Sequence, residues 1–564
     1  MEVEATSIAV AVAGPTRWQR IAGTDTVWRL CLLLGAALIA LPVVVVVASL
    51  WQPYSPVWQH LLDTVLADYV VNSLLLMAGV GLGTLVLGVS SAWLTAMCEF
   101  PGRRFFTWAL LLPMAMPAYI IAYTYTGLLD FAGPLQTALR DTFGWRYGEY
   151  WFPEIRSLGG AICMLSLVLY PYVYLLVRVA FTEQSTALLE ASRSLGRGPW
   201  RTFFGVALPV ARPAIAAGVS LVLMEALADY GTVDYFGVST FTTGIFRTWY
   251  GLGELTTAAQ LASLLLLFVF VLFALERLSR QRLRFHHGTV SKAIQRIPLR
   301  GWRAAGTRAW LALILLAAFV IPTTQLALWA GTHWRSSVDT GFMTLVSNTF
   351  MLAAIASLCC LAVALFLAYG KRLFPDWLTV AAVRTAGMGY AVPGTVIAVG
   401  VLIPFAWLDN HIDLLMQENF GMPTGLLLSG SLAALVFAYV VRFLSVSLQT
   451  VESGLSRIGS SLDESARSLG ASAGGVLRRV HLPILRGSLL TALLLVFVDV
   501  LKELPATLIL RPFNFNTLAV RAFELASDER LAAAATPALA IVLIGLLPVI
   551  LLNRGMTAGE DGHG

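Results

Sequence analysis

The chain has 564 residues, of which 58% are hydrophobic and 12% are charged, and its mean hydropathy is +0.76. Soluble globular proteins carry about 25% charged residues, so the composition excludes a soluble protein and predicts an integral membrane protein. The net charge of +6 does not indicate nucleic-acid binding, because the basic residues lie in loops between apolar runs, where they set orientation in the membrane.

Residues 1–28 precede the first long apolar run. They contain no convincing cleavable signal, since the weak apolar run 8–13 is followed by Arg17 and Arg20. We expect this segment to be a cytoplasmic N-terminal tail.

Twelve apolar runs follow, each close to the ~20 residues that a bilayer helix needs. The runs are centred on residues 30–50, 70–97, 106–127, 158–180, 210–230, 258–276, 309–330, 345–369, 380–407, 425–447, 484–505 and 533–552. They divide into six and six, and an even number gives both halves the same orientation in the membrane. The sequence therefore predicts an all-α protein of two parallel six-helix repeats, a first transmembrane domain at 29–276 and a second at 309–553, followed by a tail at 554–564.

The linker between the halves, 277–308, contains nine Lys or Arg residues and the pair His286–His287. No Cys or acidic residue accompanies these histidines, so a solvated basic connector is favoured over a metal site. Most of the 38 Lys and Arg residues fall on the side of the N-terminal tail. By the positive-inside rule, both termini and the linker are expected in the cytoplasm of a bacterial inner-membrane protein.

A polar stretch between the fourth and fifth spans occurs twice. Residues 188–212 match 462–486 at an offset of 274, with ten of 25 positions identical. Each copy predicts a short amphipathic helix that ends at a left-handed glycine, Gly196 or Gly470. Ser461 is expected to cap the second copy from three residues before Glu464. Pro209 and Pro483 are expected to stop a second short helix.

The pattern Glu-Ala-Ser-(x)3-Gly-(x)12-Pro from Glu190, and Glu-Ser-Ala-(x)3-Gly-(x)12-Pro from Glu464, resembles the EAA loops of the membrane subunits of binding-protein-dependent ABC importers. In that family the loop is the cytoplasmic coupling helix that seats in a groove of the ATPase subunit. The resemblance implies coupling loops at 183–209 and 457–483, two ATPase subunits and a periplasmic substrate-binding protein as partners. It assigns the ATPase contact to Glu190, Arg193, Gly196, Glu464, Arg467 and Gly470.

Motifs for chemistry within the chain are missing. The sequence contains no Gly-(x)4-Gly-Lys-Ser/Thr loop, no His-Glu-x-x-His and no Cys-x-x-Cys. Its five cysteines lie in or beside apolar runs without paired spacing. We therefore expect a permease subunit that is not an enzyme and has no cofactor and no permanent metal, with ATP hydrolysis in separate subunits.

Two alternatives remain open at this point. Two parallel six-span halves also describe a twelve-helix secondary transporter, and a membrane scaffold without transport is a third class. The repeated cytoplasmic loop favours the importer permease, because a secondary transporter has no use for it.

The substrate is indicated only by resemblance. Segments 228–250 and 502–521 look most like the fused permeases of ferric-iron importers, while permeases for thiamine, polyamines or another small solute remain alternatives.

Acidic residues inside the fifth span of each half predict a translocation pathway. Glu225 and Asp229 lie four residues apart, hence on one helix face, and the offset of 274 maps them onto Asp499 and Glu503. An ionisable group within a span costs about 3 kcal/mol, so four related ones require a reason. They are expected to line a water-filled cation path between facing fifth spans. The alternative is that they form ion pairs with Lys502, Arg212 or Arg247.

Overall fold

A computed structural model describes residues 24–146, 148–183, 192, 198–281, 296–337 and 340–561. Within these ranges the protein is helical, and the only sheet is a parallel pairing of β1 (Cys98–Glu99) with β2 (Ile297–Pro298). Eleven of the described helices are long and apolar enough to span a membrane, or twelve when one bent pair is counted as a single span. The predicted all-α membrane fold is confirmed.

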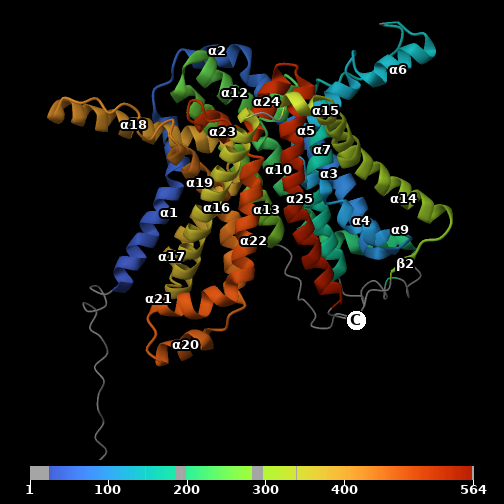
Figure 1. Cartoon of the computed structure of the whole chain (residues 1–564). Coiled ribbons are helices and arrows are strands. Elements are labelled where there is room, and N and C mark those ends of the chain that lie inside the picture. The colour runs from blue at the N-terminus through green and yellow to red at the C-terminus, as the bar shows by residue number, and fades with distance from the viewer. Residues whose placement is uncertain are drawn as a thin grey trace, which may run out of the picture.

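The first half contains six spans and several short helices (Figure 1). In chain order these are α1 (Thr24–Ala48), α2 (Val57–Thr64), α3 (Leu66–Met97), α4 (Arg103–Ala109), α5 (Ala118–Leu129), α6 (Pro134–Phe143), α7 (Leu158–Glu183), α9 (Pro199–Thr202), the π turn η3 (Phe203–Ala207), α10 (Leu208–Ala228), α11 (Gly231–Tyr235), α12 (Phe241–Phe246), the π turn η4 (Arg247–Gly251) and α13 (Leu255–Gln281).

The second half repeats this order of spans. Its elements are α14 (Trp302–Leu315), α15 (Ile321–Ser337), α16 (Thr340–Leu373), α17 (Trp377–Ala386), α18 (Gly394–Phe420), α19 (Leu432–Ser456), α20 (Ser460–Ser468), α21 (Ala473–Val476), the π turn η7 (Leu477–His481), α22 (Leu482–Leu501), α23 (Pro505–Leu510), α24 (Leu518–Ser527) and α25 (Leu531–Asp561).

The third span of each half is broken, so the prediction of a single helix over 106–127 is wrong. Two helical pieces, Arg103–Ala115 and Ala118–Phe143, meet at 93°. Pro117 forces the residue before it out of the helical region, and Met116 is extended (φ −103°, ψ 118°). Pro393 interrupts the span predicted at 380–407 in the same way, and α18 begins only after it.

A repeated Asn-Ser/Thr pair fixes the start of a short helix in each half. The Asn72 side chain donates to the Ser239 carbonyl (2.9 Å), and that of Asn348 donates to the Asn516 carbonyl (3.2 Å). The hydroxyls next in sequence accept from the first backbone N–H groups of α12 and α24. The Asn-Ser/Thr pair is therefore a second feature outside the polar loop, besides the broken third span, that both halves share.

Each half completes the hydrophobic core of the other. One buried cluster joins α3, α5, α7 and α10 of the first half to α14, α15, α24 and α25 of the second. The other joins α16, α18, α19 and α22 of the second half to α1, α12 and α13 of the first. The outer spans of each half thus pack on the central spans of the opposite half, α1 on α17 and α18, and α15 on α5.

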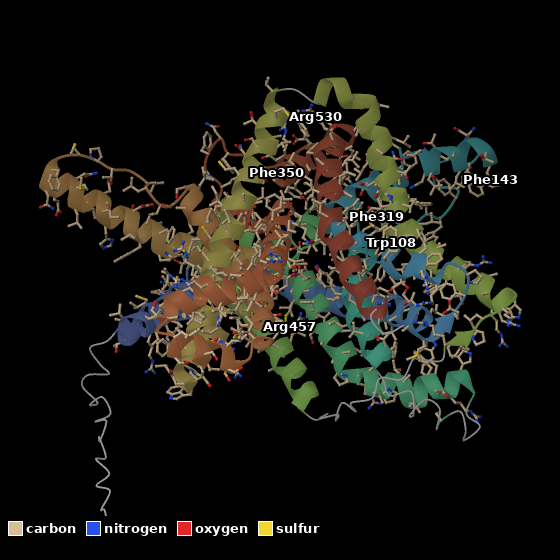
Figure 2. The ribbon with its side chains drawn as sticks, turned by 60° about the horizontal axis from the view of Figure 1, so that its bottom comes forward. Trp108, Phe143, Phe319, Phe350, Arg457 and Arg530 are labelled. Atoms are coloured by element: carbon tan, nitrogen blue, oxygen red, sulfur yellow. The ribbon has the colours of Figure 1, made fainter. Side chains whose placement is uncertain are left out.

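The two ends of the bundle differ. Figure 1 shows α20 and α21 at one end and α2, α12 and α24 at the other, which we call the α20 end and the α12 end. Near the α12 end, α6 and the C-terminal part of α18 extend on opposite sides of the molecule, and Figure 2 shows the same spread, with Phe143 at the tip of α6.

Candidate functional site

A cavity of about 130 Å³ lies between the two halves, and all four acids singled out from the sequence line it. Glu225 and Asp229 come from α10 and its end, and Asp499 and Glu503 come from α22 and its end. The fold therefore brings together two pairs of carboxylates that are 274 residues apart in the chain. The cavity also receives side chains from α5, α7 and α19.

Asp229 does not continue the helix of Glu225. It ends α10 in an extended conformation (φ −67°, ψ 130°). Its carboxylate accepts hydrogen bonds from the N–H groups of Thr232 (3.0 Å) and Val233 (3.2 Å) and from the Thr232 hydroxyl (3.1 Å). The Asp229 carboxylate therefore caps the first turn of the short helix α11 from the residue before its N-cap, Tyr230.

Glu503 has the same position in the second half. It follows the end of α22, and its carboxylate accepts from the N–H groups of Ala506 (2.8 Å) and Thr507 (3.0 Å). Arg442 of α19 adds an ion pair at 3.0 Å, and only 1% of the Glu503 side chain is exposed. The prediction that each pair shares one continuous helix face is wrong, because both helices end before the second acid.

Glu225 and Asp499 stay within their helices. Asp499 pairs with Lys502 at 2.9 Å, and the two side chains are 20% and 28% exposed. In the part of the chain that the structure describes, no Lys, Arg or His forms an ion pair with Glu225. Arg247 hydrogen-bonds Ser239 instead (3.1 Å). Among the bases named in the ion-pair alternative, only Lys502 forms a pair in the described part of the chain, and its partner is Asp499. Glu503 is also paired, but with Arg442, which the sequence analysis did not name.

Tyrosines add neutral oxygen atoms to the cavity. Tyr119, Tyr172, Tyr230 and Tyr390 line it together with the four carboxylates, and the basic residues among its lining are Arg442 and Lys502. Carboxylate and phenol oxygens are hard ligands suited to hard cations. With every group ionised, the acids exceed the bases by two (four minus two), so the lining favours a cation.

Sequence reasoning did not identify Arg442, Tyr172 or Tyr390. Arg442 could have been found, because it is a charged residue inside the span predicted at 425–447 and the rule applied to the acids also covers it. Tyr172 and Tyr390 gave no signal. A tyrosine in an apolar run is common, and neither has a tyrosine at the repeat-related position.

The fifth spans flank the cavity without packing on each other extensively. Helix α10 packs chiefly on α3, α7 and α13, and α22 packs chiefly on α16 and α19. The two spans therefore do not pack face to face as expected. They lie on either side of the cavity and each packs on other helices.

The second polar loop, which contains α20, lies at the α20 end of the molecule. Glu464 and Arg467 are exposed on α20, and Gly470 adopts φ +84°, the predicted left-handed end. The expected cap at Ser461 is wrong, because α20 begins one residue earlier and its N-cap, Gly459, offers no side chain. Glu190, Arg193 and Gly196 of the first copy lie outside the described residues.

Both prolines of the loops lie within continuing helices, contrary to the expected stop. Pro209 and Pro483 occupy the first turn of α10 and α22, and each follows a π turn, η3 or η7. The rod continues through each proline because the π turn before it replaces the regular hydrogen-bond pattern that a proline would interrupt. The loop is thereby joined to the fifth span by one rod, Ala473–Leu501 in the second half.

A polar network joins α20 to α16 and η7. The Asp463 carboxylate accepts from Arg372 Nε (2.7 Å) and is bonded to His481 Nε2 (2.6 Å). Arg372 also donates to the carbonyls of Leu455 (2.7 Å) and Ile458 (2.9 Å). Burial raises the pKa of Asp463, but the hydrogen bonds from Arg372 and His481 outweigh burial and hold it below the usual value.

Apolar side chains at the ends of α20 are left uncovered. Leu462 is 47% exposed and Leu469 is 89% exposed. Together with Glu464 and Arg467 they form a surface that has both apolar and charged parts. Such a surface, held rigidly by the Asp463 network, suits contact with another protein.

The described residues hold no group of three or more His, Cys, Asp or Glu side chains placed to bind a metal ion. A duplicated bundle of membrane spans, a charged cavity between the halves and a protruding loop after the fourth span define a polytopic membrane permease with two fused halves.

Comparison with known proteins gives the family. Residues 84–285 and 323–558 each match the family described as binding-protein-dependent transport system inner membrane component. The chain belongs to this family and carries its domain twice, so it is a multi-pass permease of the inner membrane that serves binding-protein-dependent import.

Named relatives include both full-length and partial matches. The chain is 27% identical over 496 residues to the Fe(3+)-transport system permease protein FbpB 2 of Haemophilus influenzae, covering 87% of this chain and 90% of that protein. It is 23% identical over 473 residues to the ferric transport system permease protein FbpB of Actinobacillus pleuropneumoniae, covering 78% and 64% of the two chains. The molybdenum transport system permease protein ModB of Escherichia coli is 29% identical over 181 residues, 32% of this chain and 72% of that protein.

Proposed function

We propose that this permease conducts ferric iron through the central cavity. The observation that carries the proposal is the lining of that cavity, where Glu225 and Asp499 project from related positions of the two halves beside four tyrosines. Hard oxygen donors match a hard trivalent ion. The two relatives described above that match most of this chain are named as ferric or Fe(3+) permeases, which supports the same substrate.

Other substrates fit less well. An oxyanion would meet excess negative charge in the cavity, and the match to the molybdenum transport permease covers only 32% of this chain. Thiamine and polyamines are cations and would be attracted by the same acids. Their charged nitrogens also pair with carboxylates and stack on aromatic rings, so what favours ferric iron over them is that the relatives FbpB 2 and FbpB are named as ferric or Fe(3+) permeases.

The partners and the orientation follow from the α20 end. We place this end in the cytoplasm, because the basic segments favour that side and because the exposed surface of α20 is where an ATPase subunit would bind. Two ATPase subunits, one for each polar loop, would contact Glu190, Arg193 and Gly196 in the first loop and Glu464, Arg467 and Gly470 in the second. A periplasmic binding protein would deliver iron at the α12 end. It would bind beside α6, where the rings of Phe143, Trp145 and Tyr150 stack, and beside the extended end of α18 (Figure 1).

Transport then requires alternating access. ATP binding closes the ATPase dimer, and α20 transmits the movement through η7 to α22, whose far end carries Asp499 and is followed by Glu503. The carboxylates replace part of the hydration of the ion while it is in the cavity, as acidic residues do in cation channels. Hydrolysis resets the bundle.

The test is the double variant Glu225→Gln with Asp499→Asn, which keeps shape and removes charge. We expect iron uptake into cells or proteoliposomes to fall at least about ten-fold, the equivalent of about 1.4 kcal/mol in the barrier, while the ATPase subunits still co-purify. Asp63→Asn with Glu418→Gln is the matched control, because these acids are exposed and lie one in each half. Normal iron uptake by the cavity variant would overturn the proposal, and saturable uptake of thiamine or spermidine in place of iron would correct the substrate.

A further inference from the structure

Aromatic side chains from both halves form a continuous column on the α12 side of the cavity. Tyr230 stacks on Phe246 with ring centroids 4.3 Å apart, and Phe246 stacks on Tyr250 at 5.0 Å. Phe523 of the second half meets Tyr230 at 6.0 Å and Tyr119 at 6.3 Å. These rings come from α5, α12, η4, α24 and the junction before α11, so the column crosses the boundary between the halves.

The column separates two spaces. Tyr119 and Tyr230 line the central cavity at one end of it. Tyr250 lines a second pocket of about 350 Å³ at the other end, together with Arg511, Phe513 and two asparagines. Exposure falls from 55% at Tyr250 to 6% at Tyr230, so the column runs from the surface into the interior.

The backbone beside the column is also tightly closed. A Cβ atom on Gly231 would lie 2.8 Å from Leu504 Cδ2 and 2.9 Å from Tyr119 Cβ. The starts of α11 and α23 therefore touch across the boundary between the halves. Asp229 and Glu503 hold these two starts through the hydrogen bonds described above.

We propose that Tyr230, Phe246, Tyr250 and Phe523 form the gate that closes the central cavity toward the α12 end, with Asp229 and Glu503 as positioning residues for the short helices that frame it. The proposal rests on the proposed role of the cavity as the translocation pathway. It divides the four acids into two that face the cation, Glu225 and Asp499, and two that hold the gate.

The physics of the column suits a gate. Stacked rings attract each other through weakly directional contacts, so they can separate without leaving a buried polar group unpaired. Among the described residues, the Tyr250 hydroxyl links the column to the second half by donating a hydrogen bond to the Leu508 carbonyl at 3.2 Å, at the exposed end. While the rings are stacked, their apolar faces stand between the two pockets and oppose the passage of a hydrated ion.

Accessibility of a cavity cysteine tests the gate directly. The full-length chain would carry Ala at its five native cysteines and one reporter, Leu169→Cys, which lines the cavity. In right-side-out membrane vesicles containing the whole transporter, a membrane-impermeant maleimide should label this reporter slowly. With Tyr230→Ala and Phe246→Ala added, we expect labelling at least ten-fold faster.

Two controls make the result specific, and one milder variant replaces the double variant if needed. Asn516→Cys in the second pocket should be labelled rapidly in every background, which also verifies that the α12 end faces outward. Phe241→Ala removes a ring from the same helix, α12, that packs on Tyr69 and Phe268 away from the cavity, and it should leave the reporter protected. If the double variant does not accumulate, Phe246→Leu alone should still raise labelling several-fold, because it removes the flat ring and keeps apolar bulk.

The outcomes separate the gate from the substrate. Rapid labelling of the reporter with all four rings intact, or slow labelling after their removal, overturns the gate. The readout uses no substrate, so the gate can stand when the proposed function fails. A gate that behaves as expected, together with normal iron uptake by the Glu225→Gln, Asp499→Asn variant, would reject the role of these acids in the cation path, and no iron uptake by the unmodified transporter would reject ferric iron as cargo.

Discussion

Asp229 and Glu503 show how equivalent residues acquire different surroundings. Each caps the short helix that follows it, and each sits at the end of a fifth span. Only Glu503 has an arginine partner, because Arg442 corresponds to Val168 at the offset of 274. The repeat therefore predicted the positions of the acids correctly, but it carried no information about the bases that balance them.

Asp463 is a second residue whose charged and hydrogen-bonding partners have no counterparts at the repeat-related positions of the other half. At the same offset its counterpart is Leu189, and that of His481 is Ala207. The second polar loop is therefore held by charge, while in the first half Trp93 packs on Phe181 and Phe203. The position of the second loop depends on one carboxylate and its two partners.

Asp463→Asn should destabilise the purified permease in a pH-dependent way. The folded state holds the pKa of Asp463 below the ordinary value of about 3.9, so it binds the proton more weakly than the unfolded chain does. The stabilisation is therefore fully present above pH ~3.9 and is lost as pH falls through the lower, folded pKa. We expect about 2 kcal/mol at pH 7, typical of hydrogen bonds to a charged group.

Thermal unfolding in detergent at pH 7 and along an acid series measures this effect. Arg372→Met is the informative companion, because it removes a partner and leaves the carboxylate. Melting curves of wild type and Asp463→Asn that differ equally at pH 7 and below pH 3 would show that the loss is one of packing and not of charge.

At the scale of elements, hydropathy locates the spans because each requires about 20 apolar residues. The breaks at Pro117 and Pro393 escape it, since both prolines lie inside apolar runs and change geometry without changing composition. The partners of each span escape it too. A helix that is apolar all round does not indicate which face packs, so the placement of α1 on α18 and α15 on α5 could not be read from periodicity.

The sequence predicted the end of α20 correctly, because a helix that ends at a left-handed glycine can be identified from the neighbouring residues alone. Gly470 at φ +84° turns the chain between α20 and α21, and no atom lies close to where its Cβ would be. A side chain placed at this position would therefore be strained by the backbone conformation alone, and not by contact with neighbouring atoms. The anchoring of α20 by Arg372, 91 residues away from Asp463, has no local signature.

Gly470→Val should uncouple transport while leaving the membrane bundle folded. A β-branched residue at positive φ costs about 1–3 kcal/mol, which is enough to turn α20 away from its position beside α21. We expect binding-protein-stimulated ATP hydrolysis in reconstituted transporter to fall at least about five-fold with the melting temperature nearly unchanged. Gly474→Val is the matched control, since this glycine is helical, has open space and has no positive φ. Equal loss in both variants would mean that side-chain bulk, and not the turn, is responsible.

At the scale of the whole molecule, the sequence predicted two parallel halves but not how they combine. Parallel duplication is compatible with two self-contained bundles placed side by side. The structure instead distributes both halves over two cores, so Leu32 and Leu265 of the first half are buried with Leu367 and Leu444 of the second. The cavity acids come together because these shared cores fix α10 and α22 across from each other.

Cutting the chain in its basic linker, between His287 and Gly288, tests this shared packing. Each fragment expressed alone lacks the outer spans that cover its central helices, and we expect it to be degraded or to be cleaved by protease within its spans. Co-expressed fragments should restore a protease-resistant pair that co-purifies, because both cores can then form and neither requires the covalent link. The matched control is the uncut chain with an inserted protease site in the linker, cleaved after folding, which should stay assembled. A first fragment that alone matches the melting temperature of the intact permease would show that the halves are independent bundles, and the shared cores would then not be what positions Glu225 opposite Asp499.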